Sequence, residues 1–200
     1  LQYPSNFIEL NSISDKREQI PLELIFCEKK DCSLLQLKHT ASRESLYKEY
    51  WFRSGLNEKM VEALNDITKS VEKRISLSEN DIVLDIGCND GTLLRSYQSK
   101  VRLVGFEPAS NLVDEAKEGT DLIINNFFNS HEFMQHFPNE RIKVITSIAM
   151  FYDLEDPNSF VSDIVNCLDQ DGIWVIQMAY IIPMLEFHGH SLITRRAFVW

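Results

Sequence analysis

The feature that most constrains the fold is the regular alternation, from residue 82 onward, of apolar segments typical of buried strands with segments typical of helices. A strand, a helix and a second strand form the unit from which parallel sheets with right-handed crossovers are built. We therefore predict an α/β fold with a doubly wound, mostly parallel sheet. The expected strands span 82–86, 101–106, 121–125, 143–149 and 173–178, and the expected helices span 91–100, 111–118, 130–137 and 158–168. We also expect Ser110 to cap the helix at 111–118 and residues 169–172 to form a turn.

The charge of the chain argues against nucleic acid as a partner. The 200 residues include 20 Lys and Arg against 30 Asp and Glu, a formal net charge of −10, whereas a nucleic-acid-binding protein needs a basic surface. Residues 1–76 hold 12 basic and 12 acidic side chains, so all of the excess negative charge follows residue 76. This change in composition predicts a boundary near Ser76–Ser78. No segment approaches the ~20 apolar residues of a membrane helix, so we expect no membrane partner.

The part of the chain before this boundary is expected to hold two strands and one long helix. The strands span 20–26 and 33–38. An aromatic linker at 50–55 leads into an amphipathic helix at 56–75, whose apolar stripe is formed by Met60, Leu64, Ile67 and Val71. We expect this helix to pack across the sheet, either with or without an added role in covering a ligand.

The cysteines indicate a reducing compartment. The chain has four Cys, too few and too scattered for the disulfide scaffold of a small secreted protein. We therefore expect a cytoplasmic protein with reduced thiols. Cys88 has no basic neighbour in the sequence that would activate it as a nucleophile, and Cys167 lies in an apolar stretch of its helix.

The strongest functional signal is the turn between the first strand and the first helix of the alternating region. It has the spacing D-x-G-x-x-x-G, with Asp85, Gly87 and Gly91, and Asn89 lies inside it. Gly87 allows a tight turn and the close approach of a ligand, while the backbone N–H groups after Gly91 favour polar or anionic groups. The spacing differs from the G-x-G-x-x-G of nicotinamide enzymes.

Glu107, at the end of the second strand, strengthens this signal. It follows Asp85 by 22 residues, in a position where a carboxylate can accept hydrogen bonds from both hydroxyls of a ribose. Pro108 adds a stiff apolar surface beside the ring of a nucleoside. The alternative is an acid at the strand end that caps the following helix.

Together these residues resemble the motifs of the S-adenosylmethionine-dependent methyltransferases with a Rossmann-like fold. The resemblance implies that the glycine turn runs under the methionine part of the cofactor and that Glu107 binds its ribose. It also implies that Phe127 and Phe128 flank the adenine, with Asn126 nearby; core packing is the alternative for both rings. Ser147 and Ala149 would line the cofactor cleft, or else serve strand packing.

A narrower resemblance, from about Pro21 to Glu186, is to the nucleotide-sugar C-methyltransferases. It rests on residues 21–24, 50–60, 86–94, 105–109 and 145–157. It implies methylation of a carbon of a nucleotide-linked keto-deoxysugar, in which a base forms an enolate. A His-containing segment after the fifth strand supplies that base in the family, so the candidates here are Tyr180, His188 and His190. The segment 187–191 departs from the family pattern, and solvated tail histidines are the alternative.

The same family begins with a small zinc-binding domain. Cys27 and Cys32 lie where its second cysteine pair belongs, although they are spaced more widely, and a first pair is missing. Two thiolates do not complete the four ligands that zinc prefers, so two idle thiols are the alternative. His39 is a third candidate ligand or an exposed strand-end histidine.

These observations predict four parts: a partial zinc-ribbon-like segment at 1–50, a linker and long helix at 51–78, a cofactor-binding domain at 79–186 and a tail at 187–200. We interpret the chain, which lacks an initiator Met, as truncated at both ends. With only ten residues after His190, we expect an incomplete C-terminal sheet edge without the usual antiparallel strands, although the tail itself can supply one strand. Two alternatives remain: methylation of another small molecule at oxygen or nitrogen, and a cofactor-binding remnant without catalysis. The sequence leaves the oligomeric state open.

Overall fold

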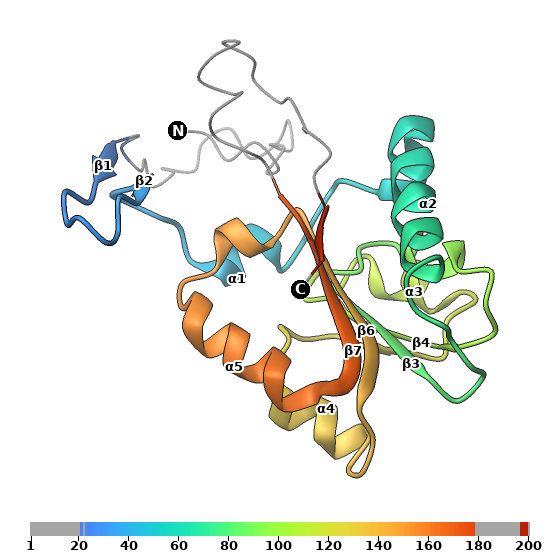
Figure 1. The fold of residues 1–200 in the computed structure, drawn as a ribbon. Coiled ribbons are helices and arrows are strands. Elements are labelled where there is room, and N and C mark those ends of the chain that lie inside the picture. The colour runs from blue at the N-terminus through green and yellow to red at the C-terminus, as the bar shows by residue number, and fades with distance from the viewer. Residues whose placement is uncertain (1–20, 22, 179–196, 200) are drawn as a thin grey trace, which may run out of the picture. The chain divides into compact units, whose positions relative to one another are not determined.

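The computed structural model describes residues 21, 23–178 and 197–199, and the chain divides into two compact units at residues 52 and 53. The first unit contains the antiparallel strands β1 (Leu24–Phe26) and β2 (Leu35–Leu37) and the helix α1 (Arg43–Tyr47). Figure 1 shows this hairpin. Its strand residues are all exposed, so the hairpin has no buried core of its own among the described residues.

The second unit contains a six-stranded sheet in the order β5-β4-β3-β6-β7-β8. Its strands are β3 (Ile82–Ile86), β4 (Arg102–Phe106), β5 (Leu122–Ile124), β6 (Ile142–Ile148), β7 (Leu168–Gln177) and β8 (Ala197–Val199). The first five pair in parallel, which confirms the predicted doubly wound α/β sheet. β8 pairs antiparallel with β7, and it is the one strand that the tail was expected to be able to supply. Three residues are enough to add one.

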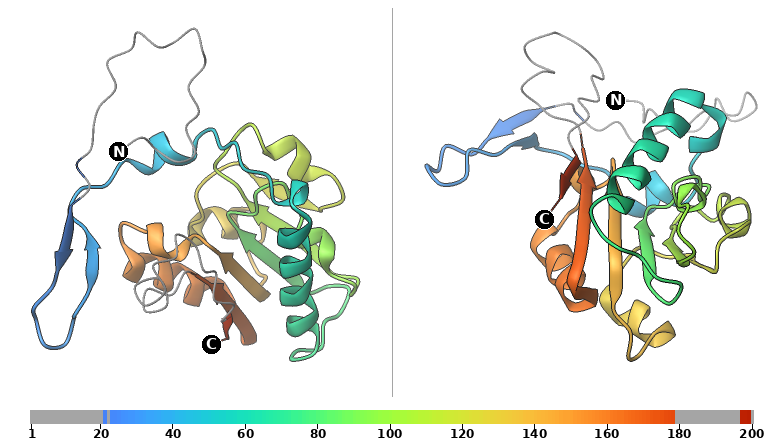
Figure 2. Two further views of the ribbon diagram at one scale, coloured as in Figure 1. Left: turned by 90° about the horizontal axis from the view of Figure 1, so that it is seen from above. Right: turned by 45° about the vertical axis from the view of Figure 1, so that its right-hand side comes forward.

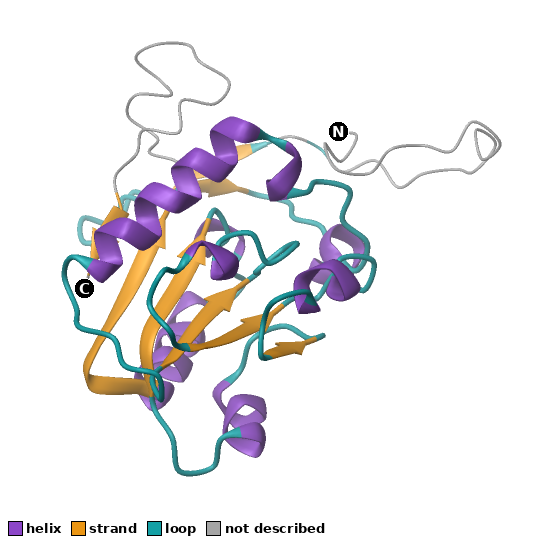
Figure 3. Ribbon diagram, turned by 90° about the vertical axis from the view of Figure 1, so that its right-hand side faces the viewer, coloured by secondary structure: helices purple, strands orange, loops and turns teal. Residues whose placement is uncertain are grey.

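Helices cover both faces of this sheet. One face carries α2 (Glu58–Glu72), the 3-10 turn η3 (Leu94–Ser96) and α3 (Val113–Lys117), while the other carries α4 (Ser130–His136) and α5 (Pro157–Cys167). Figure 3 looks onto the face covered by α2, and the two views of Figure 2 show α4 and α5 on the opposite side. Each face therefore has its own hydrophobic core.

Strand β3 shows why the sequence forms two cores. All five of its residues are buried, and their side chains alternate between the faces of the sheet. Ile82, Leu84 and Ile86 join the cluster under α4 and α5, and Val83 joins the cluster under α2. A continuous apolar run is what a parallel strand covered on both faces requires.

Helix α2 packs across the sheet through the apolar stripe expected from its sequence. Leu64, Ile67 and Val71 are buried, and Met60 is partly buried against the same cluster. Asn57 begins the helix by accepting hydrogen bonds from the backbone N–H groups of residues 59 and 60. Each fully buried side chain of this size contributes about 1.5–3 kcal/mol relative to an exposed one.

The helix expected at 91–100 is wrong, because only the single turn η3 forms there. Gly91 has a φ of +78°, which is incompatible with a helix at that residue. The hydroxyl of Ser96 donates to the carbonyl of Thr92, and this bond competes with helical pairing. Beyond the turn, the backbone N–H groups of Gln98 and Ser99 donate to the carboxylate of Glu72 in α2.

Two further local expectations are corrected. Ser110 does not cap a helix: its hydroxyl donates to Asn125, and α3 begins only at Val113, without a side-chain cap. The turn expected at residues 169–172 does not form, because these residues belong to β7, which begins at Leu168. Leu168 already pairs with Ile142, and a register shift between the two strands accommodates the polar residues that follow.

Candidate functional site

The candidate site lies where the carboxyl ends of β3, β4 and β6 meet at one edge of the sheet. β3 is central, with β4 on one side and β6 on the other. The chain runs from β3 to β4 first and reaches β6 later, so this edge is a topological switch point. The loop after β3 carries the glycine turn (residues 87–91), β4 is followed by Glu107, and β6 is followed by Ala149. Ligands of open parallel sheets bind at such an edge.

The glycine turn uses left-handed backbone at three residues: φ is +71° at Gly87, +54° at Asn89 and +78° at Gly91. The backbone N–H of Gly87 donates to the carbonyl of Phe106, which ties the turn to the end of β4. A Cβ atom added at Gly87 would meet only the Cγ of Met150, at 4.0 Å. The backbone is therefore open at Gly87.

Gly91 has a different role. A Cβ atom there would lie 2.7 Å from Nη1 of Arg95 and 3.0 Å from the carbonyl oxygen of Ala116. This glycine lets the turn pack against α3, whereas Gly87 leaves space on the exposed side of the turn. Of the two glycines, only Gly87 provides room for a ligand.

The carboxylate of Glu107 joins the glycine turn to the segment after β4. Its Oε2 accepts the backbone N–H of Asn89 at 2.7 Å, and its Oε1 accepts the backbone N–H of Ala109 at 2.8 Å. The bond to Ala109 lies four residues before α3, so it is not a cap of that helix. An ionised carboxylate has about four acceptor positions, which leaves one on each oxygen for a ligand. Glu107 is only 5% exposed, and this burial raises its pKa to about 7.

Asp85 is a second buried acid at the same edge. It pairs in register with Thr146 of β6, whose hydroxyl donates to the Asp85 carboxylate at 2.5 Å. Burial raises the pKa of Asp85 to about 7; the bond from Thr146 opposes this rise, and the charge of Glu107 adds to it. Cys88 lies in the turn beside these acids and is buried. This burial, together with the nearby acids, raises the pKa of its thiol well above the usual value, so Cys88 is not an activated nucleophile.

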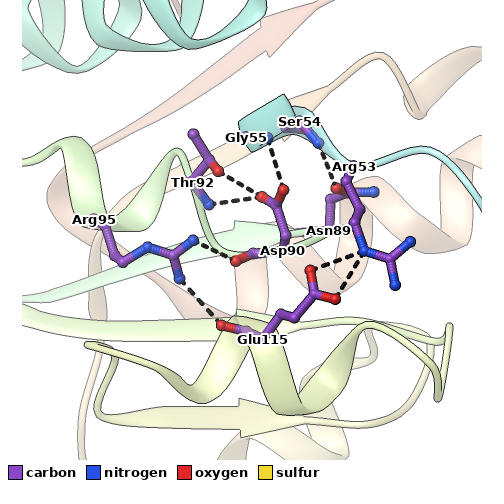
Figure 4. A network of polar contacts seen from close by, with 8 residues as sticks. All are labelled: Arg53, Ser54, Gly55, Asn89, Asp90, Thr92, Arg95 and Glu115. Carbon is purple, nitrogen blue, oxygen red and sulfur yellow. Dashed lines mark hydrogen bonds and ion pairs between the residues drawn. The ribbon is translucent and has the colours of Figure 1, made fainter. Parts of the chain in front are cut away.

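A strap formed by residues 53–55, just before α2, closes over the glycine turn, and Figure 4 shows its contacts. The backbone N–H of Ser54 donates to Oδ1 of Asn89 at 2.9 Å, and that of Gly55 donates to Oδ2 of Asp90 at 2.7 Å. The other oxygen of Asp90 accepts the hydroxyl and the backbone N–H of Thr92. Sequence reasoning treated the strap as a linker and missed Asp90 and Thr146. A glycine three residues before the first residue of α2 was the available signal for the strap.

The remaining candidate residues for cofactor binding lie in different environments. Pro108 and Phe127 are half-buried, and the exposed Asn126 donates to Glu132. Ser147 is fully buried and its hydroxyl accepts the indole N–H of Trp174. Ala149 is exposed with a φ of +55°.

Phe128 belongs to the core. It is buried and makes edge contacts with Phe106 and Phe160. Of the two roles considered for this ring, contact with adenine and core packing, its position therefore supports core packing.

The described residues do not complete a zinc site. Cys27 and Cys32 are free thiols, and His39 lies 3.5 Å from the carboxylate of Glu23. No group of three or more His, Cys, Asp or Glu residues in the described ranges is arranged to hold a metal ion. Two thiols alone do not fit a tetrahedral zinc site.

The candidates for the base, Tyr180, His188 and His190, lie outside the described residues.

Within the described ranges, no helix is long and apolar enough to span a membrane.

These features coincide with a family assignment. A family model described as a methyltransferase domain matches residues 55–185, and the chain belongs to this family. The match contains the glycine turn, Glu107 and the end of β6.

Among curated proteins, the chain is similar to the C-methyltransferase NovU of Streptomyces niveus, with 23% identity over 181 residues, 85% of this chain and 42% of that protein. It is also 32% identical over 90 residues to the uncharacterized methyltransferase C70.08c of Schizosaccharomyces pombe, 43% of this chain and 34% of that protein. The chain thus spans less than half the length of these relatives.

Two solved structures are similar in fold. The plantazolicin methyltransferase BpumL, in complex with a pentazolic desmethylPZN analog and SAH, matches with a TM-score of 0.52 at 16% identity over 67% of this chain and 52% of that chain. BamL, in complex with a triazolic analog and SAH, matches with a TM-score of 0.51 at 18% identity over 68% and 53%. At these identities the likeness concerns the fold alone.

Proposed function

We propose that this protein is an S-adenosylmethionine-dependent methyltransferase. The observation that carries the proposal is the geometry of Glu107: a buried carboxylate at the end of β4 holds the glycine turn and keeps one acceptor position free on each oxygen. The similarity to structures solved with SAH supports the choice of cofactor.

The residues at the sheet edge fit this cofactor. Glu107 accepts the two ribose hydroxyls, and the backbone at Gly87 accommodates the methionine part because its Cβ position has only the Cγ of Met150 nearby, at 4.0 Å. The carboxylate of Asp85 provides negative charge near the sulfur. Phe127 and Pro108, both half-buried, offer apolar surface to the adenine. When bound, the cofactor supplies a methyl group on a positively charged sulfur.

We further propose that the acceptor is a carbon of a nucleotide-linked keto-deoxysugar. The resemblance to nucleotide-sugar C-methyltransferases and the similarity to a C-methyltransferase of Streptomyces niveus support this choice. A base removes the proton from the carbon beside the ketone, and the resulting enolate is the nucleophile. Tyr180, His188 and His190 remain the candidates for this base.

The experiment uses S-adenosylmethionine whose methyl carbon is ¹³C, incubated with the protein and a nucleotide-linked 3- or 4-keto-deoxysugar. The proposal predicts a product whose labelled methyl carbon couples to a sugar carbon in the NMR spectrum. It also predicts that, without the cofactor, the protein exchanges the hydrogen beside the ketone with deuterium from the solvent.

The two alternatives give different results in the same experiment. A labelled methyl group attached to oxygen or nitrogen would support heteroatom methylation of a small molecule and overturn C-methylation. Binding of S-adenosylhomocysteine without transfer of the labelled methyl group to carbon, oxygen or nitrogen would support a cofactor-binding remnant.

A further inference from the structure

The strap brings one partly engaged arginine to the glycine turn. Nε of Arg53 donates to both carboxylate oxygens of Glu115, at 2.8 and 2.9 Å. Figure 4 shows the guanidinium beside this carboxylate, with its two terminal nitrogens bonded to none of the residues drawn. Within the described part of the chain, Nη1 and Nη2 of Arg53 have no hydrogen-bond partner. The guanidinium therefore keeps its bidentate edge free.

The position of Arg53 is fixed relative to the turn. Its neighbour Ser54 donates a backbone hydrogen bond to Asn89, and Gly55 donates one to Asp90. A Cβ atom at Gly55 would lie 2.9 Å from the hydroxyl of Thr92, so the strap lies tightly against the turn. The Arg53 side chain is 27% exposed and can meet a ligand that lies along the turn.

The other arginine of this region, Arg95, has both terminal nitrogens engaged. Arg95 donates from Nη2 to the carbonyl of Asp90 at 2.6 Å, and from Nη1 to the carbonyls of Glu115 and Glu118. These bonds hold the turn to α3, and they occupy the edge formed by the two terminal nitrogens, which is the edge that stays free in Arg53.

The surrounding negative charge favours a cation as the partner of an anionic ligand group. Asp85, Asp90, Glu107 and Glu115 all lie at or beside the turn, and they would repel a further carboxylate. The proposed cofactor carries one carboxylate, at the end of its methionine part, and that part runs along the glycine turn. A guanidinium with a free edge binds such a carboxylate with two parallel hydrogen bonds.

We propose that the terminal nitrogens of Arg53 bind the carboxylate of the cofactor's methionine part, with Glu115 holding the guanidinium in place. This inference rests on the proposed function, because it assigns one group of the proposed cofactor to a residue of the same site. The strap thereby becomes part of the cofactor site as well as the lead into α2.

The test compares two ligands that differ in the amino-acid part: S-adenosylhomocysteine, which has the carboxylate, and 5′-methylthioadenosine, which lacks it. Both are titrated calorimetrically into the wild-type chain, Arg53→Met and the control Lys59→Met. Lys59 is an exposed cation of α2, six residues away, so the control removes the same charge without touching the turn. Arg53→Met is expected to weaken the binding of S-adenosylhomocysteine by about tenfold to hundredfold. It is expected to weaken the binding of 5′-methylthioadenosine by less than about twofold. Lys59→Met is expected to change neither.

Arg53→Lys keeps the charge but not the planar guanidinium, and we expect it to lose severalfold in affinity for S-adenosylhomocysteine alone. Unchanged binding of S-adenosylhomocysteine by Arg53→Met, or an equal loss for both ligands, would overturn this inference while leaving the cofactor assignment standing. Failure of the wild-type chain to bind S-adenosylhomocysteine would instead overturn the proposed function.

Discussion

The carboxylate of Glu107 accepts the backbone N–H of Asn89 at 2.7 Å, and this bond joins the end of β4 to the turn that follows β3. Asn89 has a left-handed backbone, which is uncommon for a residue other than glycine. The bond places the carboxylate directly beside the turn. A ligand that uses Glu107 is therefore held against the open backbone of Gly87 at the same time.

The two glycines of the turn are predicted to respond differently to alanine. Gly87→Ala should keep the fold, with a loss of stability of about 1–2 kcal/mol because alanine must adopt a left-handed backbone. It should weaken the binding of S-adenosylhomocysteine at least tenfold, because the added methyl group enters the space for the ligand. Gly91→Ala should lose more stability, since its Cβ would lie within 3.0 Å of Arg95 and Ala116. Urea unfolding and calorimetric titration measure the two effects. A larger stability loss in Gly87→Ala than in Gly91→Ala would contradict this division of roles.

The buried acids make stability depend on pH in a defined direction. The pKa values of Asp85 and Glu107 are each raised to about 7 in the folded chain, from 3.8 and 4.5. Between about pH 4 and pH 7 the folded state therefore binds more protons than the unfolded state, and the free energy of unfolding from these two groups falls as pH rises. Asp85→Asn, which cannot ionise, should reduce this fall. Urea unfolding at pH 5 and pH 8 tests it, and an equal fall in wild type and variant would reject the role of Asp85.

Thr146 is predicted to tune the binding of the charged cofactor. Its hydroxyl bond lowers the pKa of Asp85, so Thr146→Val should raise that pKa further and leave Asp85 less ionised near pH 7. The variant should then bind S-adenosylmethionine, whose sulfur is positively charged, about three- to tenfold more weakly than the wild type does. Its affinity for S-adenosylhomocysteine, whose sulfur is uncharged, should change much less. At pH 9, where Asp85 is ionised in both proteins, the difference should nearly vanish. A difference that does not change with pH would show that the hydroxyl acts in another way.

Much of the second unit could be predicted from sequence because its signals are local. The apolar run of β3 and the stripe of α2 follow directly from which residues must be buried. The chemistry of the turn and of Glu107 was also visible, since glycine spacing and an acid at a strand end have physical meaning on their own. These features lie on single elements, and the parallel sheet then brings the two strand ends together.

The contacts that sequence reasoning missed are long-range. Arg53 and Glu115 are separated by 62 residues, and Thr146 follows Asp85 by 61, so no local pattern links them. The helix expected at 91–100 failed partly for the same reason, in addition to the local backbone of Gly91 and the bond of Ser96. One backbone carbonyl that engages Arg95, that of Glu115, belongs to α3, and the acceptor that fixes residues 98 and 99 belongs to α2.

The most direct test of the central claim is whether Glu107 recognises the ribose of the adenosyl cofactor. S-adenosylhomocysteine and its 2′-deoxy analogue are titrated into the wild-type chain, Glu107→Gln and the control Glu62→Gln, an exposed acid of α2. We expect Glu107→Gln to bind S-adenosylhomocysteine about tenfold to hundredfold more weakly, to lose much less with the deoxy analogue, and to differ in both respects from the control. Equal affinity of wild type and Glu107→Gln for S-adenosylhomocysteine, or no binding by the wild type, would contradict the claim.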